Sequence, residues 1–399
     1  MSRKLMGILA TLLLGTMSPT YGLDNGLAQT PPMGWNSWNG FRFGVSEKLV
    51  KETIDAVASN GLKEAGYVYI VLDDGWQGER DDNDILQPHP EKFPSGIKAL
   101  AEYAHSKGLK LGIYSCPNVL TCGNETGSLG YETIDAQTWA DWGIDFLKYD
   151  HCPTRNQERD LPGEEILKRY KTMREALAAT GRPIVYSIAD KGWVDGTDLS
   201  NPDRFSWAPE VVNMWRTTQD IKPKWSRIMQ ILDWQDGIAH LAKPGAWNDP
   251  DMLEVGNGQL SLAENRAHFS LWCILAAPLM LGNDLRDMSP EILEILTNKE
   301  VVALNQDSLG KQGEKVWDGG DQEIFIKPLA GGSLGVVMLN RGDSGTTMTL
   351  EWDHLKLSAT ATAQLRDLWK KADLGEFNGK YSAEVASHDV VTLRVTPKN

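Results

Sequence analysis

Residues Ile144 to Asp150 read Ile-Asp-Phe-Leu-Lys-Tyr-Asp, an apolar run that ends on a lysine and a carboxylate. The apolar residues predict a buried strand, and Asp150 stands at its carboxyl end. In a barrel of parallel strands, the side chains at the carboxyl ends converge on one open mouth. This stretch therefore predicts a catalytic acid at such a mouth, within reach of acids that other strands carry.

Further apolar runs alternate with helix-like stretches ahead of Gln312. The expected strands are Met33–Trp38, Tyr67–Asp73, Lys110–Ser115, Ile144–Tyr149, Pro183–Ile188, Val211–Arg216, Ala246–Trp247 and Leu279–Gly282. The expected helices include Ser46–Asn60, Ile97–Ser106, Gly163–Thr180, Lys224–Ala242, Ala263–Ala276 and Pro290–Thr297. Such alternation is typical of a parallel α/β sheet, and eight strands close most simply into a (β/α)8 TIM barrel.

The pattern changes after Gln312, where Gly and Asp turns separate shorter alternating runs. The expected strands here are Glu323–Pro328, Leu334–Asn340, Thr346–Leu350, Ala361–Asp367, Ser382–Val385 and Val390–Val395. They predict a small antiparallel β-sandwich that caps the barrel. The expected division is a signal peptide at 1–22, a catalytic barrel at 23–312 and the C-terminal sandwich at 313–399.

Charge and the N-terminal segment limit the classes of function. Forty basic and 54 acidic residues give a net charge of −14, which argues against nucleic acid and anionic membranes as partners. Arg3 and Lys4 precede the apolar run from Leu5 to Leu14, as in a secretory signal peptide. We therefore expect export to the periplasm or the extracellular space, with a retained membrane anchor as the alternative. No later stretch is long and uncharged enough to predict a membrane helix.

Four cysteines fit an oxidising compartment. Cys122 and Cys152 both follow predicted strand ends, so a disulfide between them is expected beside Asp150. Cys273 lies in an apolar run and is expected to be a buried free thiol, and Cys116 is not assigned to the pair. The sequence has no C-x-x-C or H-E-x-x-H spacing, so we expect neither a metal nor another cofactor.

Five stretches, in this order, carry a resemblance to a known family. They are Pro32-Met33-Gly34-Trp35-Asn36-Ser37-Trp38, Asp73-Asp74-Gly75-Trp76, Lys148-Tyr149-Asp150-His151-Cys152, Trp215-Arg216-Thr217-Thr218 with Asp220, and Trp247-Asn248-Asp249-Pro250-Asp251-Met252. They resemble glycoside hydrolase family 27, the α-galactosidases and α-N-acetylgalactosaminidases. The resemblance spans about residues 30 to 312 and implies a barrel followed by a β-sandwich.

The resemblance also implies catalytic roles. Asp150 corresponds to the nucleophile and Asp220 to the acid/base of a retaining glycosidase, which places its two carboxyl groups about 5–5.5 Å apart. Lys148, on the same face of the strand as Asp150, is expected to keep the nucleophile ionised. Asp220 is expected to need a raised pKa, because it must hold a proton at the working pH.

The remaining expected site residues would bind the sugar. The resemblance assigns Asp73 and Asp74 to the 4- and 6-hydroxyls of galactose, with Lys148 reaching the 3- and 4-hydroxyls. An ionised carboxylate accepts short, strong hydrogen bonds from such a diol. Arg216 is expected to pair with Asp251 and to offer its free N–H groups to a hydroxyl. An apolar wall is expected from Trp35, Tyr114 and Met252.

Three departures from the family pattern fall at the rim of the predicted pocket. Ala189-Asp190-Lys191 stands where α-galactosidases usually carry Cys-Glu-Trp or Cys-Gln-Tyr, a stretch that contacts the 2-hydroxyl. We expect Asp190 to take over that contact. Tyr114-Ser115-Cys116-Pro117-Asn118 and His151 also differ from the usual residues.

The expected function is that of an exported retaining exo-glycosidase. It would remove terminal α-D-galactosyl residues from a galactosylated oligo- or polysaccharide. The departures leave other sugars open, namely α-N-acetylgalactosaminide, β-L-arabinopyranoside or an isomaltose-releasing activity. A non-catalytic carbohydrate-binding protein is the alternative from another class, although such a protein has no use for two opposed catalytic acids.

Overall fold

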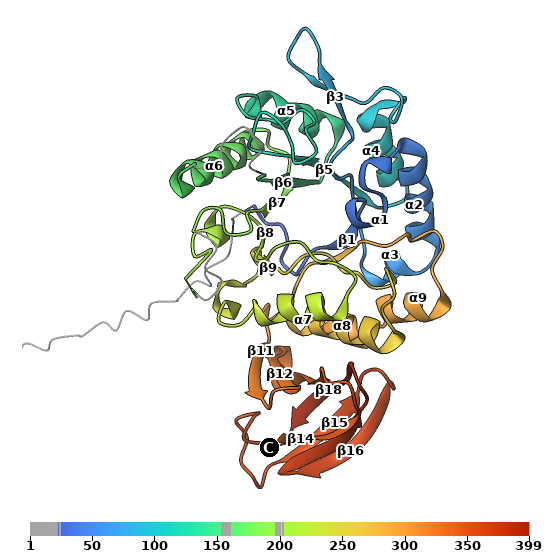
Figure 1. Ribbon diagram of the computed structural model, residues 1–399, viewed down its shortest axis with the longest axis vertical. Helices are drawn as coiled ribbons and strands as arrows, with labels where there is room; N and C mark the ends of the chain where they lie inside the picture. The colour runs from blue at the N-terminus through green and yellow to red at the C-terminus, as the bar shows by residue number, and fades with distance from the viewer. Residues whose placement is uncertain (1–22, 24, 153–160, 196–200, 202, 399) are drawn as a thin grey trace, which may run out of the picture.

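The structure is a computed structural model that describes residues 23, 25–152, 161–195, 201 and 203–398. The expected signal peptide at residues 1–22 lies outside the described residues. Eight parallel strands form one sheet in the order β10-β1-β2-β5-β6-β7-β8-β9, surrounded by helices (Figure 1). These strands are β1 (Met33–Asn36), β2 (Tyr69–Val71), β5 (Lys110–Ser115), β6 (Phe146–Asp150), β7 (Val185–Ala189), β8 (Met214–Arg216), β9 (Trp247–Asp249) and β10 (Leu279–Leu281).

The ring of strands closes through the segment that follows β9. Leu253 donates its N–H to the carbonyl of Met280 at 2.8 Å, and Gly282 donates to the carbonyl of Leu253 at 3.0 Å. Leu253 thereby pairs in parallel with Leu281 of β10. The predicted (β/α)8 barrel is confirmed, and its eight strands are those that the sequence predicts.

The strands alternate between two apolar layers. On β6, Phe146 belongs to the cluster inside the barrel, whereas Leu147 and Tyr149 belong to the larger cluster between strands and helices. Lys148 and Asp150 are therefore in phase with Phe146 and face the barrel axis, since successive side chains of a strand point to opposite faces. This alternation decides which residues reach the mouth.

The helices cover the outside of the ring. They are α1 (Trp38–Phe41), α2 (Glu47–Ser59), α3 (Leu62–Ala65), α4 (Gly96–Ser106), α5 (Glu132–Trp142), α6 (Gly163–Ala179), α7 (Trp225–Asp233), α8 (Leu262–Ile274), α9 (Pro290–Leu296) and α10 (Lys299–Asn305). Several begin at a serine, as expected: Ser46, Ser261 and Ser289 each accept a backbone N–H of the first turn.

Helix α7 is shorter than expected, and the short helices α1, α3 and α10, as well as α5, are additional to the expected ones. The helix expected at Lys224–Ala242 ends at Asp233, because the chain turns there and enters a separate short helical turn at Ala239–Leu241. The buried face of α5 includes Asp135, which pairs with Arg80 at 2.7 Å. A buried acid obscures the amphipathic pattern by which such a helix would be recognised.

The C-terminal region folds into an antiparallel sandwich, as predicted. Its larger sheet has the strand order β11-β12-β13-β18-β15-β16, and β14 pairs with β17 in the other. The strands are β11 (Glu314–Asp318), β12 (Gln322–Pro328), β13 (Leu334–Asn340), β14 (Thr346–Glu351), β15 (Thr362–Asp367), β16 (Ala372–Asn378), β17 (Lys380–Val385) and β18 (Asp389–Pro397). Strands β11 and β16 are mostly exposed or half-buried and are additional to the expected ones. A further hairpin, β3 (Gln77–Arg80) and β4 (Leu86–Pro88), projects from the barrel.

The sandwich lies against α8, on the side of the barrel where α7 and α8 run (Figure 1). Arg266 of α8 donates from Nε to Asp389 at 2.9 Å, and the indole of Trp369 donates to the hydroxyl of Ser270 at 3.0 Å. Because both the barrel and the sandwich pack on α8, most of this helix is buried, including the free thiol of Cys273 as predicted.

No helix within the described residues is long and apolar enough to cross a membrane.

Candidate active site

A cavity of about 260 Å³ opens where the carboxyl ends of the barrel strands meet. The expected site residues that line it are Asp73, Asp74, Tyr114, Lys148, Asp150, Arg216, Asp220, Asp251 and Met252, together with Cys122 and Cys152. Five acids and two basic side chains of this set come from four different strand ends. The barrel thus brings together residues that are far apart in the sequence, as the strand-end positions predict.

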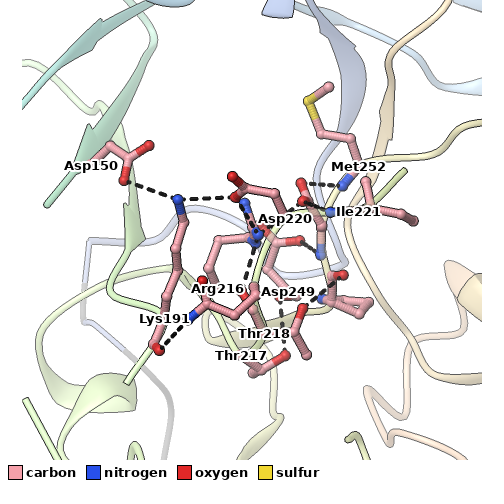
Figure 2. A network of polar contacts seen from close by, with 12 residues as sticks. Asp150, Lys191, Arg216, Thr217, Thr218, Asp220, Ile221, Asp249 and Met252 are labelled. Atoms are coloured by element: carbon pink, nitrogen blue, oxygen red, sulfur yellow. Dashed lines mark hydrogen bonds and ion pairs between the residues drawn. The ribbon is translucent and has the colours of Figure 1, made fainter. Parts of the chain in front are cut away.

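Two carboxylates share one ammonium group at the centre of the cavity (Figure 2). Nζ of Lys191 lies 2.9 Å from Oδ1 of Asp220 and 3.8 Å from Oδ1 of Asp150. The two oxygens therefore lie no farther apart than the sum of these distances. The side chain of Asp150 is 9% exposed and that of Asp220 is 64% exposed, so one acid is at the base of the cavity and the other at its open side.

Their surroundings shift the two acids in opposite directions. Burial raises the pKa of Asp150, and the nearby charges of Lys191 and Lys148 offset only part of this shift. Desolvation also acts to raise the pKa of Asp220, but the charges of Arg216 and Lys191 outweigh it, so that pKa falls well below its ordinary value. Asp220 is thus the more acidic member of the pair, contrary to the expectation from sequence.

Arg216 and Asp251 form the expected ion pair, and it supports the loop that carries Asp220. Nη2 of Arg216 lies 2.8 Å from Oδ2 of Asp251 and 3.1 Å from Oδ1 of Asp220. The same Asp251 oxygen accepts the backbone N–H of Ile221 at 2.8 Å. Asp251 itself has a φ of 91°, a conformation that side-chain-bearing residues rarely adopt and that clusters at functional sites. The pair therefore fixes the position of Asp220 from two directions.

A second group of acids lies on the other side of the cavity. Oδ2 of Asp73 accepts from Nζ of Lys148 at 2.7 Å and from Nδ2 of Asn36 at 2.8 Å. Asp74 pairs with no lysine among the described residues and accepts the N–H of Gly123 at 2.7 Å. Burial, together with the neighbouring charge of Asp73, raises the pKa of Asp74 to about 7. This group presents several polar atoms to a hydroxylated ligand.

The expected disulfide joins Cys122 to Cys152 and borders both groups of acids. Cys152 lies two residues beyond Asp150, and the hydroxyl of Tyr114 lies 3.1 Å from the sulfur of Cys122. Within the described residues, one group of three side chains has metal-ligand spacing, and it consists of Asp150 and these two cysteines. Because the two sulfurs are bonded to each other, neither offers a thiolate to a metal.

Comparison with known families identifies the family of both parts of the chain. The family described as Alpha galactosidase A matches residues 30–307. The family described as Alpha galactosidase C-terminal beta sandwich domain matches residues 319–395. This chain belongs to the α-galactosidase family. The predicted membership of glycoside hydrolase family 27 is therefore confirmed, and so is the predicted enzyme class, a glycoside hydrolase of the α-galactosidase type.

Individual relatives cover nearly the whole chain. Alpha-galactosidase 3 of Arabidopsis thaliana is 46% identical over 381 residues, 94% of this chain and 84% of that protein. Alpha-galactosidase A of Cellvibrio japonicus is 42% identical over 414 residues, 98% of each chain. The crystal structure of α-galactosidase I from Mortierella vinacea superposes with a TM-score of 0.88 at 40% identity, covering 93% of this chain and 98% of that chain.

Against this family background, two expected site residues do not line the cavity. The indole of Trp35 donates to the carbonyl of Asn283 at 2.9 Å, within the layer between strands and helices. Asp190 is fully buried and accepts from the hydroxyl of Tyr170 at 3.2 Å and from the N–H of Gly192 at 3.1 Å. Burial raises its pKa to about 7. The assignments of Trp35 to the sugar wall and of Asp190 to the 2-hydroxyl are corrected accordingly.

Two residues outside the set expected from sequence also line the cavity. Trp38, in the short helix after β1, lines the cavity, as does Lys191. On β7, Tyr186 and Ile188 face the helices. Asp190, two residues after Ile188, therefore also points toward the helices, and Lys191 points toward the barrel axis. The alternation along β7 is therefore the sequence signal that could have identified Lys191. Trp38 likewise lies two residues past its strand, and it is out of phase with Trp35, which packs in the layer between strands and helices, so the same alternation selects it.

Proposed function

We propose that this member of the α-galactosidase family removes terminal, non-reducing α-D-galactosyl residues with net retention of configuration. The observation that carries the proposal is the opposition of Asp150 and Asp220 across one small cavity. Their oxygens are close enough to share the ammonium of Lys191. Retaining glycosidases place their two carboxyl groups about 5–5.5 Å apart, so that one can attack the anomeric carbon directly.

Each acid has one role in each half of the reaction. In the first half, Asp150 attacks the anomeric carbon while Asp220 gives its proton to the glycosidic oxygen, and the C–O bond to the leaving group breaks. In the second half, the Asp220 carboxylate removes a proton from water, which attacks the same carbon and releases Asp150. The buried Asp150 suits the nucleophile, and the more exposed Asp220 suits the group that meets leaving group and water.

The size and polarity of the cavity favour one terminal sugar. A volume of about 260 Å³ is close to the lower limit of about 300 Å³ for pockets that hold drug-sized ligands, so a single ring fits better than a chain. Asp73, Asp74 and Lys148 offer charged hydrogen-bond partners opposite the catalytic pair. A ring with adjacent hydroxyls can bind both groups at once, as the galactose assignment requires.

A panel of nitrophenyl glycosides tests the sugar and the stereochemistry. We expect the α-galactoside to be cleaved faster than the α-N-acetylgalactosaminide, the β-L-arabinopyranoside and the α-glucoside. Proton NMR of the first product should show α-galactose before mutarotation produces the β-anomer. Faster cleavage of another member would reassign the sugar, while β-galactose as the first product would contradict retention. Binding without any turnover would indicate a carbohydrate-binding protein instead.

We also propose that the protein is exported to the periplasm or the extracellular space. The disulfide between Cys122 and Cys152 supports this, because such bonds persist in oxidising compartments. The basic and apolar pattern at residues 1–22 supports it as well. Fractionation of cells that express the full chain should place activity outside the cytoplasm, and replacing the apolar run should retain it inside.

A further inference from the structure

We propose that Lys191 is a displaceable cation that bridges the two catalytic carboxylates in the empty enzyme and leaves the gap when the sugar enters. In this role it sets the pH range over which the free enzyme can react. The inference rests on the proposed function, because it takes Asp150 and Asp220 as the catalytic pair.

The position of Lys191 follows from the order of strands in the barrel. Asp150 ends β6 and Asp220 follows β8, while Lys191 follows β7, which lies between those two strands. Ala189 of β7 pairs in register with Asp150, so Lys191 extends just past the nucleophile. Figure 2 shows its ammonium between the two carboxylates.

The backbone at Lys191 is also unusual. Its φ is 54°, in the left-handed region that residues with a side chain rarely occupy, and Gly192 follows with a φ of 92°. Such conformations persist where the surrounding structure holds them, and they cluster at functional sites. Here the buried carboxylate of Asp190 holds the turn by accepting the N–H groups of Gly192 and Val194 at 3.1 and 3.3 Å. The turn directs Lys191 into the cavity.

Two other nearby cations have partners of their own, and one of them, Arg216, also lies 3.1 Å from Asp220. Lys148 pairs with Asp73 at 2.7 Å, and Arg216 pairs with Asp251 at 2.8 Å. The cations that line the same cavity besides Lys191 are Arg42, Lys148, Arg216 and Lys222, and Arg227 contacts the backbone of Asp220. The other acids that line it are Asp73, Asp74 and Asp251, and Asp249 lies near Arg216. Among the described residues, Lys191 is the cation that forms ion pairs with both catalytic carboxylates.

The proposed reaction requires the ammonium to move. The anomeric carbon must approach Asp150 while the glycosidic oxygen lies within hydrogen-bond reach of Asp220, and this is the space that Nζ of Lys191 now borders. A lysine has a long flexible stem and can withdraw, whereas a planar guanidinium held by two carboxylates cannot do so as easily. Withdrawal removes a positive charge from Asp220, which then holds the proton that the first half-reaction needs.

The experiment compares pH profiles of kcat/KM for three variants with that of the unchanged enzyme, using nitrophenyl α-galactoside. The variants are Lys191→Met, Lys191→Arg and, as a control, Lys168→Met, which removes an exposed lysine from α6. The profile of kcat/KM reports the ionisations of the free enzyme. A nearby cation lowers the pKa of a carboxyl, so losing Lys191 should move both limbs to higher pH, by about one unit.

The shift of both limbs to higher pH is expected whichever acid carries the first proton. Both limbs belong to the coupled pair, and both acids are close to the lost charge. Lys191→Arg keeps the charge and should leave the limbs near their original positions while lowering activity, since the larger group withdraws less readily. Lys168→Met should match the unchanged enzyme. Thermal denaturation checks that each variant is folded, and Lys191→Gln replaces Lys191→Met if that variant is not.

The outcomes separate this inference from the proposed function. Limbs that stay in place for an active, folded Lys191→Met would overturn the inference and leave the galactosidase assignment intact. The same holds if Lys191→Arg shifts the limbs as far as Lys191→Met does. An unchanged enzyme that hydrolyses no α-galactoside would instead overturn the proposed function.

Discussion

The mouth of the barrel holds two pairs of acids, each with one lysine, and the lysines are used differently. Lys191 lies between Asp150 and Asp220 and touches both. On the opposite side, Lys148 is bonded to Asp73, and its neighbour Asp74 pairs with no lysine in the described part of the chain. The first arrangement makes the two acids unequal through burial and shared charge. In the second, Asp73 forms an ion pair with Lys148, and Asp74 has a raised pKa.

This difference indicates that similar residues can serve chemistry in one place and binding in another. The catalytic pair needs two protonation states that exchange during the reaction. The sugar-binding pair needs polar atoms that stay where they are, and its contacts to Asn36 and Gly123 fix both side chains. Changes on the two sides should therefore affect different kinetic constants.

The largest effect is expected from the catalytic pair. Asp150→Ala should lower kcat/KM by about 10⁴-fold or more, because no other described carboxylate can form the bond to the anomeric carbon. Asp220→Ala should cost about 10²- to 10⁴-fold on a disaccharide but much less on a nitrophenyl glycoside, whose leaving group needs little help from an acid. Steady-state kinetics with both substrates measure the contrast. Equal losses on the two substrates for Asp220→Ala would contradict its assignment.

A smaller effect is expected on the sugar-binding side. Asp73→Asn should raise KM by about ten- to a hundredfold, because a hydrogen bond to a charged group is worth about 1.5–3 kcal/mol. We expect the fold decrease in kcat to be smaller than the fold increase in KM. Asp82→Asn, an exposed residue in the turn between β3 and β4, serves as the control and should behave as the unchanged enzyme. A loss confined to kcat would place Asp73 with the chemistry and remove the contrast between the two sides.

The raised pKa of Asp74 gives a prediction about pH. In the empty site this pKa is about 7, and hydroxyl donors of a bound sugar should lower it by stabilising the carboxylate. Binding then releases a proton. The Kd of galactose should therefore rise by up to about tenfold for each pH unit below that pKa, and it should not change with pH above that pKa. Calorimetric titration measures this dependence. Asp74→Asn should flatten it, and an unchanged slope in that variant would assign the dependence to another group.

The disulfide links the two sides, and its removal should give the mildest effect on activity. Cys152 adjoins the catalytic side, and Gly123, next to Cys122, donates to Asp74. The double variant Cys122→Ser/Cys152→Ser should lose about 3 kcal/mol of stability through the closed loop of 30 residues and show a lower Tm. Kinetic constants on both sides should worsen a fewfold. Cys273→Ser, at a buried free thiol, is a control for the loss of sulfur alone.

Most of the fold and much of the site follow from strand patterns in the sequence. Asp150 and Lys148 could be placed together because they are two residues apart on one strand, and the barrel then brings Asp220, Arg216 and Asp251 to the same mouth. The same rule, applied to β7, excludes Asp190 and selects Lys191, as the phase of Ile188 indicates.

Other features depend on tertiary contacts that no local pattern records. The low pKa of Asp220 arises because Arg216, at the end of the same strand β8, and Lys191, past the neighbouring strand β7, both approach it. Their convergence is a property of the closed barrel, so the sequence analysis expected a raised pKa instead.

The most direct test of the catalytic assignment is to trap the covalent intermediate. A 2-deoxy-2-fluoro-α-galactosyl fluoride should be turned over slowly enough to leave a fluorosugar on the nucleophile, and peptide mass spectrometry locates it. Our account predicts one label, on Asp150, which disappears when the enzyme is left to hydrolyse it. A label on a different carboxylate, or an enzyme that remains unlabelled while cleaving nitrophenyl α-galactoside, would contradict it.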